Sequence, residues 1–330
     1  MDAHGARVVV IGGGTGTFTV LSGLKHYVQD LSAVVTMADD GGSSGVLRDE
    51  MGVLPPGDIR QCLVALSPRS HLMRELLNYR FESGQFKGHA FGNLFLTALE
   101  QVSGSFEEAV KAAEQILNIS GRVIPVTTDD TRLTLEVNGH KVSGEQHVIE
   151  TSFDRDDQPL LRLEPQAEIN PDAVEAIAGA DMIVIGPGDL YGSLIPNLLV
   201  RGMQPALVNS AATKVLVCNL INKPGQTDGF MAHDYVDELE KYTSAGFFDY
   251  VIYSNQKPPR TLLDKYAQDE ETWVEHDAAQ LKQRSVQGVG ANVLSNNLST
   301  PAEGDTLMER NLIRHDSQRL AKELMKLYFS

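Results

Sequence analysis

The chain has 330 residues, of which 42% are hydrophobic and 22% charged, and its formal net charge at pH 7 is −16. This composition is typical of a soluble globular protein. The excess of negative charge argues against nucleic acid or an anionic membrane surface as a partner.

The sequence has no run of about 18 apolar residues, and its first residues lack the basic and then apolar pattern of a secretion signal. We therefore expect a cytoplasmic protein without membrane insertion. Its two cysteines, Cys62 and Cys218, lie in the apolar segments QCLVAL and VLVCNLI. Such surroundings predict buried, unpaired thiols.

Short apolar runs alternate with helical patterns along most of the chain. The first run, residues 7–11 (RVVVI), ends in glycines and precedes an apolar-periodic stretch from Phe18 to Leu31. The same strand signal returns at 33–37, 181–185, 206–208, 214–221 and 249–253. Continuous rather than alternating apolar strands predict a parallel sheet that is covered on both faces. We predict an α/β, Rossmann-like fold with a mostly parallel sheet, whose ligands bind beyond the carboxyl ends of the strands.

Two segments depart from this pattern within a single domain of residues 1–330. Residues 122–170 are rich in Thr and Val and contain Asn138-Gly139, a hairpin turn signal, which predicts a small antiparallel β addition. Residues 282–306 are rich in Gln, Asn, Ser and Gly and predict a mobile segment. A last helix is expected from about Asp305, with packing positions at Leu312, Ile313, Leu320, Leu324 and Leu327.

The first glycine-rich loop, in VVVIGGGTGTF, joins the first expected strand to a helix. It contains Gly12, Gly13, Gly14, Thr15, Gly16 and Thr17. Glycines let the backbone approach a phosphate closely, and a helix N-terminus offers free N–H groups and a partial positive charge. The loop therefore predicts a phosphate-bearing ligand. A dinucleotide fingerprint would have glycine at Thr17, and a P-loop would continue with Gly-Lys-Ser/Thr, so neither motif is complete.

A second loop, TMADDGGSSG, follows the next expected strand and begins with two acids. Its candidate ligand-binding residues are Asp39, Asp40, Gly41, Gly42, Ser43 and Ser44. The carboxylates could hold Mg²⁺, with Asp40 as the candidate metal ligand, could hydrogen-bond a ribose or base, or could act as a general base. The alternative is that both acids cap and shape the turn.

Two more motifs precede apolar helices. In PPGDIR, Asp58 is expected to cap a helix and Arg60, one turn further, to reach a diphosphate. In GHAFGNL, glycines on each side of His89 and Asn93 suggest a close backbone approach to a ligand. His89 joins Asp39 and Asp40 as a candidate catalytic residue, although a lone histidine is more often packed or capping.

A third junction of strand, glycines and helix occurs in IGPGDLYGSLIPNLL, with Gly186, Pro187 and Gly188. The following Asp189 stabilises a helix start but opposes an incoming anion. In CNLINKPGQTDGF, Asn219 begins a polar loop after another expected strand. Five such motifs at the strand ends of one sheet together predict a ligand site.

In this order, GGGTG, ADDGGSSG, PPGDIR, GHAFGNL, IGPGDLYGSLIPNLL and CNLINKPGQTDGF resemble the gluconeogenesis factor family (YvcK-like), within the superfamily of 2-phospho-L-lactate transferase, CofD. The resemblance extends from residue 7 to about 328 and implies a Rossmann-like sheet with the ligand at the strand ends. The transferase branch moves a phospholactyl group from a guanosine diphosphate-linked donor with magnesium. The gluconeogenesis-factor branch, which the sequence resembles more closely, is thought to bind UDP-sugars and to support cell shape and wall synthesis.

On that branch, Tyr266 and Arg314 match positions associated with the UDP-sugar. A tyrosine could stack on uracil and an arginine could bind the diphosphate through two hydrogen bonds. The sequence departs from the family pattern where Asp189 stands for a serine, Gly192 for a threonine and Asn222-Lys223 for Thr-Gln.

The first hypothesis is a regulatory protein that binds a nucleotide-sugar, needs no cofactor and supports cell morphogenesis during gluconeogenic growth. The second is a transferase that uses Mg²⁺ and a nucleotide-diphospho-linked donor. A nicotinamide-dependent dehydrogenase is the third and ranks last, because the first loop lacks its third glycine. Sheets of this class commonly form dimers, so we expect a homodimer that acts through a cell-shape partner protein.

Overall fold

The central sheet has seven strands in the order β12-β10-β8-β7-β1-β2-β3, and every neighbouring pair is parallel. The computed structural model describes residues 5–68, 71–295 and 312–330. The α/β class with a parallel sheet is therefore confirmed. The strands of the sheet are β1 (Arg7–Gly12), β2 (Asp30–Val35), β3 (Arg122–Pro125), β7 (Met182–Ile185), β8 (Thr213–Val217), β10 (Tyr250–Ser254) and β12 (Gln287–Ala291).

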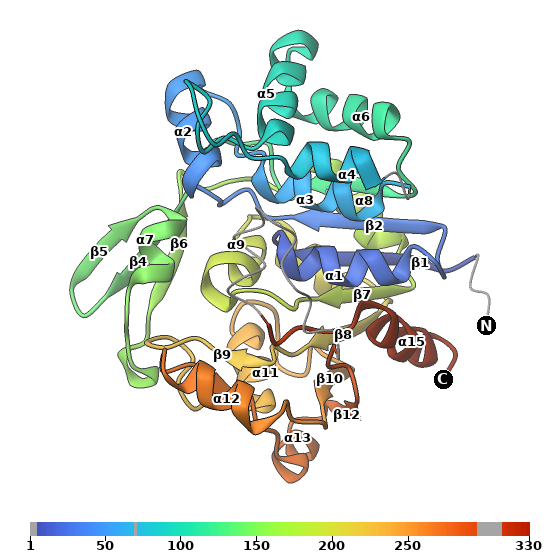
Figure 1. The fold of residues 1–330 in the computed structure, drawn as a ribbon. Helices are drawn as coiled ribbons and strands as arrows, with labels where there is room; N and C mark the ends of the chain where they lie inside the picture. The colour runs from blue at the N-terminus through green and yellow to red at the C-terminus, as the bar shows by residue number, and fades with distance from the viewer. Residues whose placement is uncertain (1–4, 69–70, 296–311) are drawn as a thin grey trace.

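Helices cover both faces of this sheet, as predicted. In front of it in Figure 1, α1 (Thr15–Leu24) packs against α3 (Gly57–Leu66) and α15 (Ser317–Tyr328). On the other face, α8 (Pro171–Gly179) packs against α10 (Met203–Asn209). Right-handed crossovers run from β1 toward one edge of the sheet and from β7 toward the other edge. Their helices therefore lie on opposite faces.

The remaining elements surround this framework. They are α2 (Gly42–Met51), α4 (His71–Asn78), α5 (Phe91–Ser103), α6 (Phe106–Leu117), α7 (Glu145–Glu150), η1 (Arg155–Asp157), η2 (Leu190–Leu194), α9 (Ile195–Leu198), β9 (Ile221–Asn222), α11 (Ala232–Glu240), α12 (Arg260–Ala267), β11 (Thr272–Trp273) and α13 (Ala278–Gln283). Among the described residues, no helix has both the length and the apolar character needed to cross a membrane.

A small antiparallel sheet lies to the left of the main sheet in Figure 1. It has the order β5-β4-β6 and contains β4 (Arg132–Val137), β5 (His140–Ser143) and β6 (Leu160–Glu164). Asn138 and Gly139, at φ 52° and 75°, form the predicted hairpin turn between β4 and β5. The boundary of the expected addition at 122 is wrong, because β3 is paired with β2 in the main sheet.

Two other predictions need correction. Residues 206–208 are helical and belong to α10, because three apolar residues are too few to separate a strand from a buried helical turn. Residues 287–291, expected in a mobile segment, form the edge strand β12. A Cβ at Gly288 or Gly290 would lie 3.0–3.2 Å from the Tyr253 ring, so the strand's glycines allow this aromatic ring to lie on it. Residues 296–306 lie outside the described part of the chain.

The last helix begins later than expected. Asp316 caps α15 by accepting hydrogen bonds from the backbone N–H groups of Gln318 and Arg319, so Leu312 and Ile313 precede the helix. The predicted start at Asp305 lies outside the described residues. The two cysteines are buried and unpaired, as predicted.

Candidate functional site

Two glycine loops meet where the connections of the sheet change direction. From β1 the chain proceeds to β2 and β3, whereas from β7 it proceeds to β8, β10 and β12 on the other side. The loops after β1 and β7 contact each other, since a Cβ at Gly16 would lie 1.9 Å from the Pro187 carbonyl oxygen. A switch point of this kind opens a ligand position beyond the carboxyl ends of two neighbouring strands.

Side chains of α1 and α3 fix the first loop in place. Thr17 is fully buried, and its Oγ1 lies 2.5 Å from the place a Cβ on Gly12 would take. Thr15 Oγ1 donates to Gln61 Oε1 at 3.0 Å, which fixes the start of α1 to α3. The Asp58 carboxyl lies against the loop, with an oxygen 2.5 Å from the Cβ position of Gly14. The loop is therefore lined by an acid rather than by a cation.

The second loop holds its two aspartates in different ways. Asp39 accepts from the Gly41 N–H at 3.0 Å and from the Ser44 side chain, so it shapes its own loop. Asp40 accepts from the Gln146 N–H at 2.9 Å and thereby binds the start of α7. One Asp40 oxygen therefore anchors the small β unit, and the role of Asp40 as a metal ligand stays a prediction.

Asp39, Asp58 and Glu145 form an acidic group beside the loops. Burial, followed by the charge of Asp39, raises the pKa of Asp58 to about 8, against a smaller opposing effect of Arg60. Burial and the neighbouring acids, Asp39 and Asp58 first among them, raise the pKa of Glu145 to about 9. Burial also raises the pKa of Asp39, opposed by its hydrogen bonds from Ser44 and Gly41. At neutral pH the group therefore keeps protons that isolated carboxylates would lose.

Arg60 and Asn93 lie against each other. Arg60 Nε donates to Asn93 Oδ1 at 2.9 Å and Nη1 donates to Asn78 Oδ1, and both Arg60 and Asn93 are buried. A Cβ at Gly92 would lie 2.6 Å from the Arg60 side chain, so this glycine makes room for the arginine. These contacts tie α3 to α4 and α5, and the binding of a diphosphate by Arg60 stays a prediction.

His89 reaches the second loop, where its Nδ1 lies 3.1 Å from Ser43 Oγ. A serine and a histidine have the composition of a nucleophile and its base. Ser43, however, is only 6% exposed and lies in the first turn of α2, which makes it a poor nucleophile for an external substrate. The contact therefore serves chiefly to join the segment before α5 to the loop.

The third loop is fixed by Asn219, whose predicted role in ligand binding stays a prediction. Asn219 Nδ2 donates to the Gly188 carbonyl oxygen at 2.8 Å, and the Gly188 N–H donates to Asn219 Oδ1 at 3.1 Å. This reciprocal pair holds the Gly186–Gly188 loop over β8. Asn219 therefore acts on the shape of the site.

Two departures from the family pattern are neighbours in space. Lys223 Nζ lies 2.7 Å from Asp189 Oδ2, and Asp189 Oδ1 accepts from the Gly192 N–H. The positive charge of Lys223 thus offsets the negative charge of Asp189 at the start of η2, where the sequence predicts an anionic ligand. Gly192 lets α7 approach, because its Cβ would lie 2.6 Å from Ile149 Cγ2. Asn222 is buried, where it accepts from Tyr235 Oη.

We expect the pair of Asp189 and Lys223 to show opposite single-variant effects on anion binding. Lys223→Met leaves Asp189 uncompensated and should weaken binding about tenfold, whereas Asp189→Ser frees the ammonium and should strengthen it. The double variant should return close to wild type. Titration of the four proteins with one nucleotide ligand measures these effects, and a double variant that binds as weakly as Lys223→Met would contradict this account.

Tyr266 departs from its predicted role. Only 5% of it is exposed, within a cluster with Leu220, Trp273, Leu294 and Ile313. Its hydroxyl accepts from the Ile313 N–H at 3.0 Å. The ring therefore offers no open face for stacking on uracil in this structure. It fixes the backbone immediately before Arg314 instead.

The segment around Arg314 reaches the same edge of the sheet as Asn219. His315, next along the chain, hydrogen-bonds the backbone of Cys218 at the end of β8, and burial lowers the pKa of His315 to about 4. Arg314 itself is half-buried, and its carbonyl accepts from the Ser295 N–H. Arg314 thus precedes a residue that is bonded to the end of β8, and its binding of a diphosphate stays a prediction.

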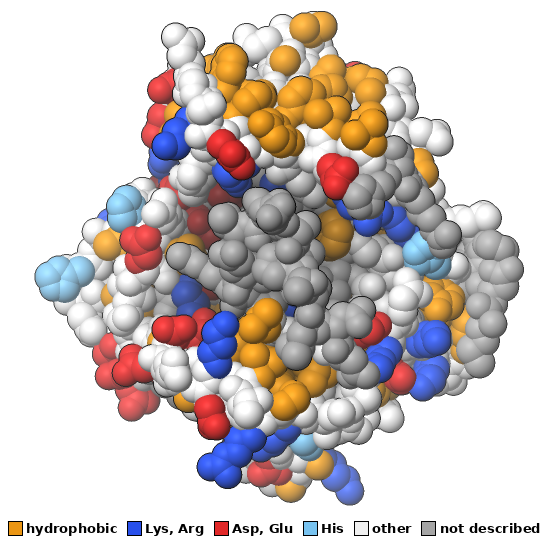
Figure 2. All heavy atoms as spheres, in the orientation of Figure 1, with side chains coloured by type: hydrophobic (Ala, Val, Ile, Leu, Met, Phe, Trp, Pro, Cys, Tyr) orange, Lys and Arg blue, Asp and Glu red, His pale blue; other side chains and the backbone are white. Residues whose placement is uncertain are grey.

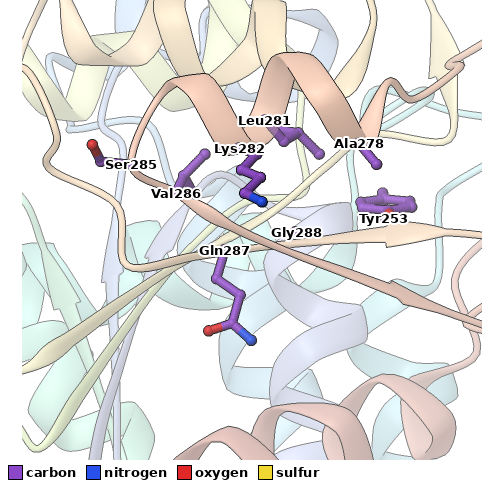
Figure 3. Close-up of a pocket in the computed structure, with 8 residues that line it drawn as sticks. All are labelled: Tyr253, Ala278, Leu281, Lys282, Ser285, Val286, Gln287 and Gly288. Atoms are coloured by element: carbon purple, nitrogen blue, oxygen red, sulfur yellow. The ribbon is translucent and has the colours of Figure 1, made fainter.

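A separate pocket of about 330 Å³ lies between α13 and the start of β12. In Figure 3, Tyr253, Leu281 and Lys282 line the space beneath α13, whereas Gln287 extends away on the far side of the strand. The pocket contains none of the predicted site residues. Within the described ranges, no three His, Cys, Asp or Glu side chains are grouped to hold a metal ion.

Sequence reasoning missed Asp58 and Glu145 as site residues. The sequence predicts that Asp58 caps a helix. In the structure α3 begins at Gly57 after Pro56, and Asp58 lies in its first turn and faces the first loop. A Cβ at Gly57 would lie 2.2 Å from an Asp39 oxygen, so the glycine before Asp58 was the available signal. The local sequence gives no signal for Glu145, because only the folding of the small β unit brings this residue to the site.

Known proteins are similar in sequence to this chain over most of its length. The family model of 2-phospho-L-lactate transferase CofD matches residues 8–294. A protein from Thermoanaerobacterium thermosulfurigenes, whose name places it among the gluconeogenesis factors, is 44% identical over 98% of this chain and 97% of its own. Gluconeogenesis factor from Bacillus subtilis is 35% identical over 97% and 98% of the two chains.

A solved structure agrees with these relatives. A UPF0052 family member from Bacillus halodurans superimposes with a TM-score of 0.87 at 33% identity, covering 97% of this chain and 98% of that one. The match includes the sheet and the glycine loops, since both chains are covered almost completely. The chain belongs to the CofD family and is similar over nearly its whole length to proteins named gluconeogenesis factor.

Proposed function

We propose that the protein binds a UDP-sugar at the carboxyl edge of the sheet and acts as a cytoplasmic regulator of cell shape and wall synthesis during gluconeogenic growth. The observation that carries the proposal is the contact between the loops after β1 and β7, at Gly16 and Pro187. Two glycine-rich backbones at one switch point suit a diphosphate, which is bound by N–H groups rather than by many cations. The relatives named gluconeogenesis factor support the link to gluconeogenic growth.

The nucleotide and sugar take different sides of the proposed site. The first loop and the start of α1 would bind phosphate, and Arg314 beside the end of β8 would contribute a cation. The Asp189–Lys223 pair stands near the start of η2, where it would meet the distal part of the ligand. No acceptor or covalent step is needed for such a binding protein.

A Mg²⁺-dependent transferase is the second candidate, and the CofD match favours it. Magnesium is commonly held by one or two carboxylates together with phosphate oxygens. Asp58, which faces the first loop, Asp39 and the predicted ligand Asp40 would be the candidate carboxylates to hold it. In that case the acids would hold the ion, which would supply the positive charge that stabilises the nucleoside monophosphate leaving group.

Substitution of Arg314 tests the proposed site directly. Arg314→Lys keeps the charge but loses the paired hydrogen bonds, and Arg314→Ala loses both, so UDP-sugar affinity should fall about tenfold and about a hundredfold respectively. Fluorescence or calorimetric titration measures both, with Arg260→Ala on the exposed start of α12 as the charge-matched control. Unchanged affinity in Arg314→Ala would remove this residue from the site.

A further inference from the structure

A cavity of about 330 Å³ lies outside the candidate ligand site, between α13 and the start of β12 (Figure 3). Small-molecule pockets measure roughly 300–1,000 Å³, so its size suits a small ligand. The loops after β1, β2 and β7 contribute no residue to the described lining, which comes from β10, α13 and residues 285–288. The cavity is therefore separate from the nucleotide-sugar site proposed above.

The α13 wall of the cavity is fixed at both ends. Asp277 caps the start of α13 by accepting hydrogen bonds from the N–H groups of Ala279 and Gln280. Just after the helix, Arg284 donates to both carboxylate oxygens of Asp237 on α11, with Nε at 2.6 Å from Oδ1 and Nη2 at 2.8 Å from Oδ2. A guanidinium that binds a carboxylate at two points also fixes its orientation. These contacts keep α13 from collapsing onto β12.

Tyr253 forms the opposite wall and is held in place by its neighbours. Its ring stacks on His276, with 4.3 Å between the ring centres. The glycines of β12 lie against the same ring, since Cβ atoms at Gly288 and Gly290 would lie 3.0–3.2 Å from it. A side chain at Gly288 would also meet Leu281 Cδ1 at 2.9 Å, so glycine leaves room between strand and helix. Both walls are therefore in place before a ligand binds, which lowers the entropy cost of binding.

The lining carries positive charge and no negative charge. Its described residues include one cation, Lys282, and no Asp or Glu, although the chain has 44 acidic and 28 basic residues. Lys282 forms no ion pair with any other residue in the described ranges. Figure 2 shows Lys and Arg side chains at the lower end of the molecule, where α13 lies in Figure 1. The cavity therefore favours an anion.

Apolar groups line most of the remaining wall. Ala278, Leu281 and Val286 present aliphatic side chains, and Tyr253 presents its ring. A single ammonium balances one negative charge, which suits a carboxylate better than the nearly two charges of a phosphate monoester. We propose that the cavity binds a small monocarboxylic acid with an aromatic or branched apolar body, whose carboxylate pairs with Lys282 Nζ. The inference is independent of the proposed function.

Benzoate, benzyl alcohol and benzylamine share a ring and differ in charge, so they test the proposal on the full chain. We expect NMR titration of wild type to give a millimolar Kd for benzoate, which is what so small a probe allows. Benzyl alcohol should bind about fivefold more weakly, because it lacks the ion pair with Lys282. Benzylamine should bind more weakly still, because its ammonium meets that of Lys282.

Two substitutions separate the charge from the cavity. Lys282→Met keeps the aliphatic stem and loses the ammonium, so benzoate should bind about fivefold more weakly while benzyl alcohol is unaffected. Ala278→Trp places an indole in the cavity and should abolish binding of both probes. Lys322→Met, at an exposed position of α15, removes an equal charge and should bind benzoate as wild type does. Unchanged circular dichroism and melting temperature would show that the variants are folded.

Protection of a thiol locates the bound probe. Cys62 and Cys218 are buried, so Ala278→Cys supplies an accessible thiol at the cavity. Saturating benzoate should slow the alkylation of Ala278→Cys by iodoacetamide and leave that of Val208→Cys, on α10, unchanged. Absence of saturable benzoate binding to wild type up to about 20 mM, or an Ala278→Trp protein that binds benzoate as tightly as wild type, would overturn the proposal.

Discussion

Replacing Asp58 by Asn should strengthen binding of a UDP-sugar at pH 9 without magnesium and remove most of the pH dependence of that binding. The Asp58 carboxyl lies against Gly13 and Gly14, at the backbone proposed to bind the diphosphate. With a pKa raised to about 8 by burial and by Asp39, Asp58 is mostly protonated at pH 6 and mostly ionised at pH 9. The diphosphate diester keeps its charge over this range, so the change comes from the protein.

The expected size follows from Coulomb's law. Two charges about 5 Å apart at an effective dielectric constant of about 20 repel by roughly 3 kcal/mol, part of which solvent removes. About one tenth of Asp58 stays protonated at pH 9 and still accepts the ligand, so wild-type affinity should fall about eightfold, and at most about elevenfold, between pH 6 and pH 9. Asp58→Asn should stay within about threefold over this range. Glu175→Gln on the exposed side of α8 changes the net charge equally and should behave as wild type.

Magnesium separates the two functional candidates in the same variant. If Asp58 holds Mg²⁺ against the diphosphate, the ion should strengthen wild-type binding, and Asp58→Asn should lose that gain. If the protein binds its ligand without a metal, Mg²⁺ should change little in either protein. A wild type whose affinity does not vary with pH would show that Asp58 does not face the ligand.

The same carboxyl predicts a pH dependence of stability. The pKa of Asp58 is about 8 in the fold and about 4 in an unfolded chain, so between these values the folded state binds more protons. Stability therefore falls as pH rises from about 4 to about 8 and is level with respect to this group above that. Asp58→Asn should flatten this slope and be more stable than wild type at pH 8, by on the order of 2 kcal/mol. Urea unfolding at several pH values measures it, and a parallel slope in both proteins would contradict it.

Gly16→Ala should abolish ligand binding and destabilise the fold. The new Cβ would stand 1.9 Å from the Pro187 carbonyl oxygen, so the loops after β1 and β7 must separate. Because the obstacle is backbone, we expect a loss of about 2–4 kcal/mol in unfolding free energy, at the upper end for overpacking.

Gly179→Ala is the matched control. Gly179 is the last residue of α8, away from the glycine loops, and its Cβ would lie 3.7 Å from Arg7 Nη1, which is ordinary contact. It should fold with nearly wild-type stability while keeping the ligand. Urea unfolding measures the stability of both variants, and ligand titration measures their binding. A Gly16→Ala protein that binds normally would show that the contact between the loops is not the site.

The features that sequence predicted well depend on local chemistry. Asn138 and Gly139 are among the few residues that adopt positive φ readily, so the hairpin between β4 and β5 could be placed to the residue. The first and third glycine loops follow continuous apolar strands, and parallel strands bring their carboxyl ends to one edge. Their meeting at that edge was therefore predictable.

The features that sequence missed depend on contacts between distant segments. Asp40 binds the start of α7 through Gln146, 106 positions away, and no local pattern distinguishes this from a metal ligand. Tyr266 is buried in a cluster with Leu220, Trp273 and Leu294, and its hydroxyl accepts from the Ile313 N–H across 47 positions. An acid in the first turn of a helix has the same local signature whether it stabilises the helix or lines a site, which is why Asp58 was assigned to the cap.

Isothermal titration of the full chain with UDP-N-acetylglucosamine, with and without Mg²⁺, tests the proposed function most directly, with GDP and NAD as comparison ligands. A regulator built on these loops should bind the UDP-sugar at micromolar Kd or below without the metal, return it intact, and bind NAD at least a hundredfold more weakly. Binding of GDP alone and only with Mg²⁺, or breakdown of the nucleotide-sugar in the cell, would contradict this account and identify a transferase.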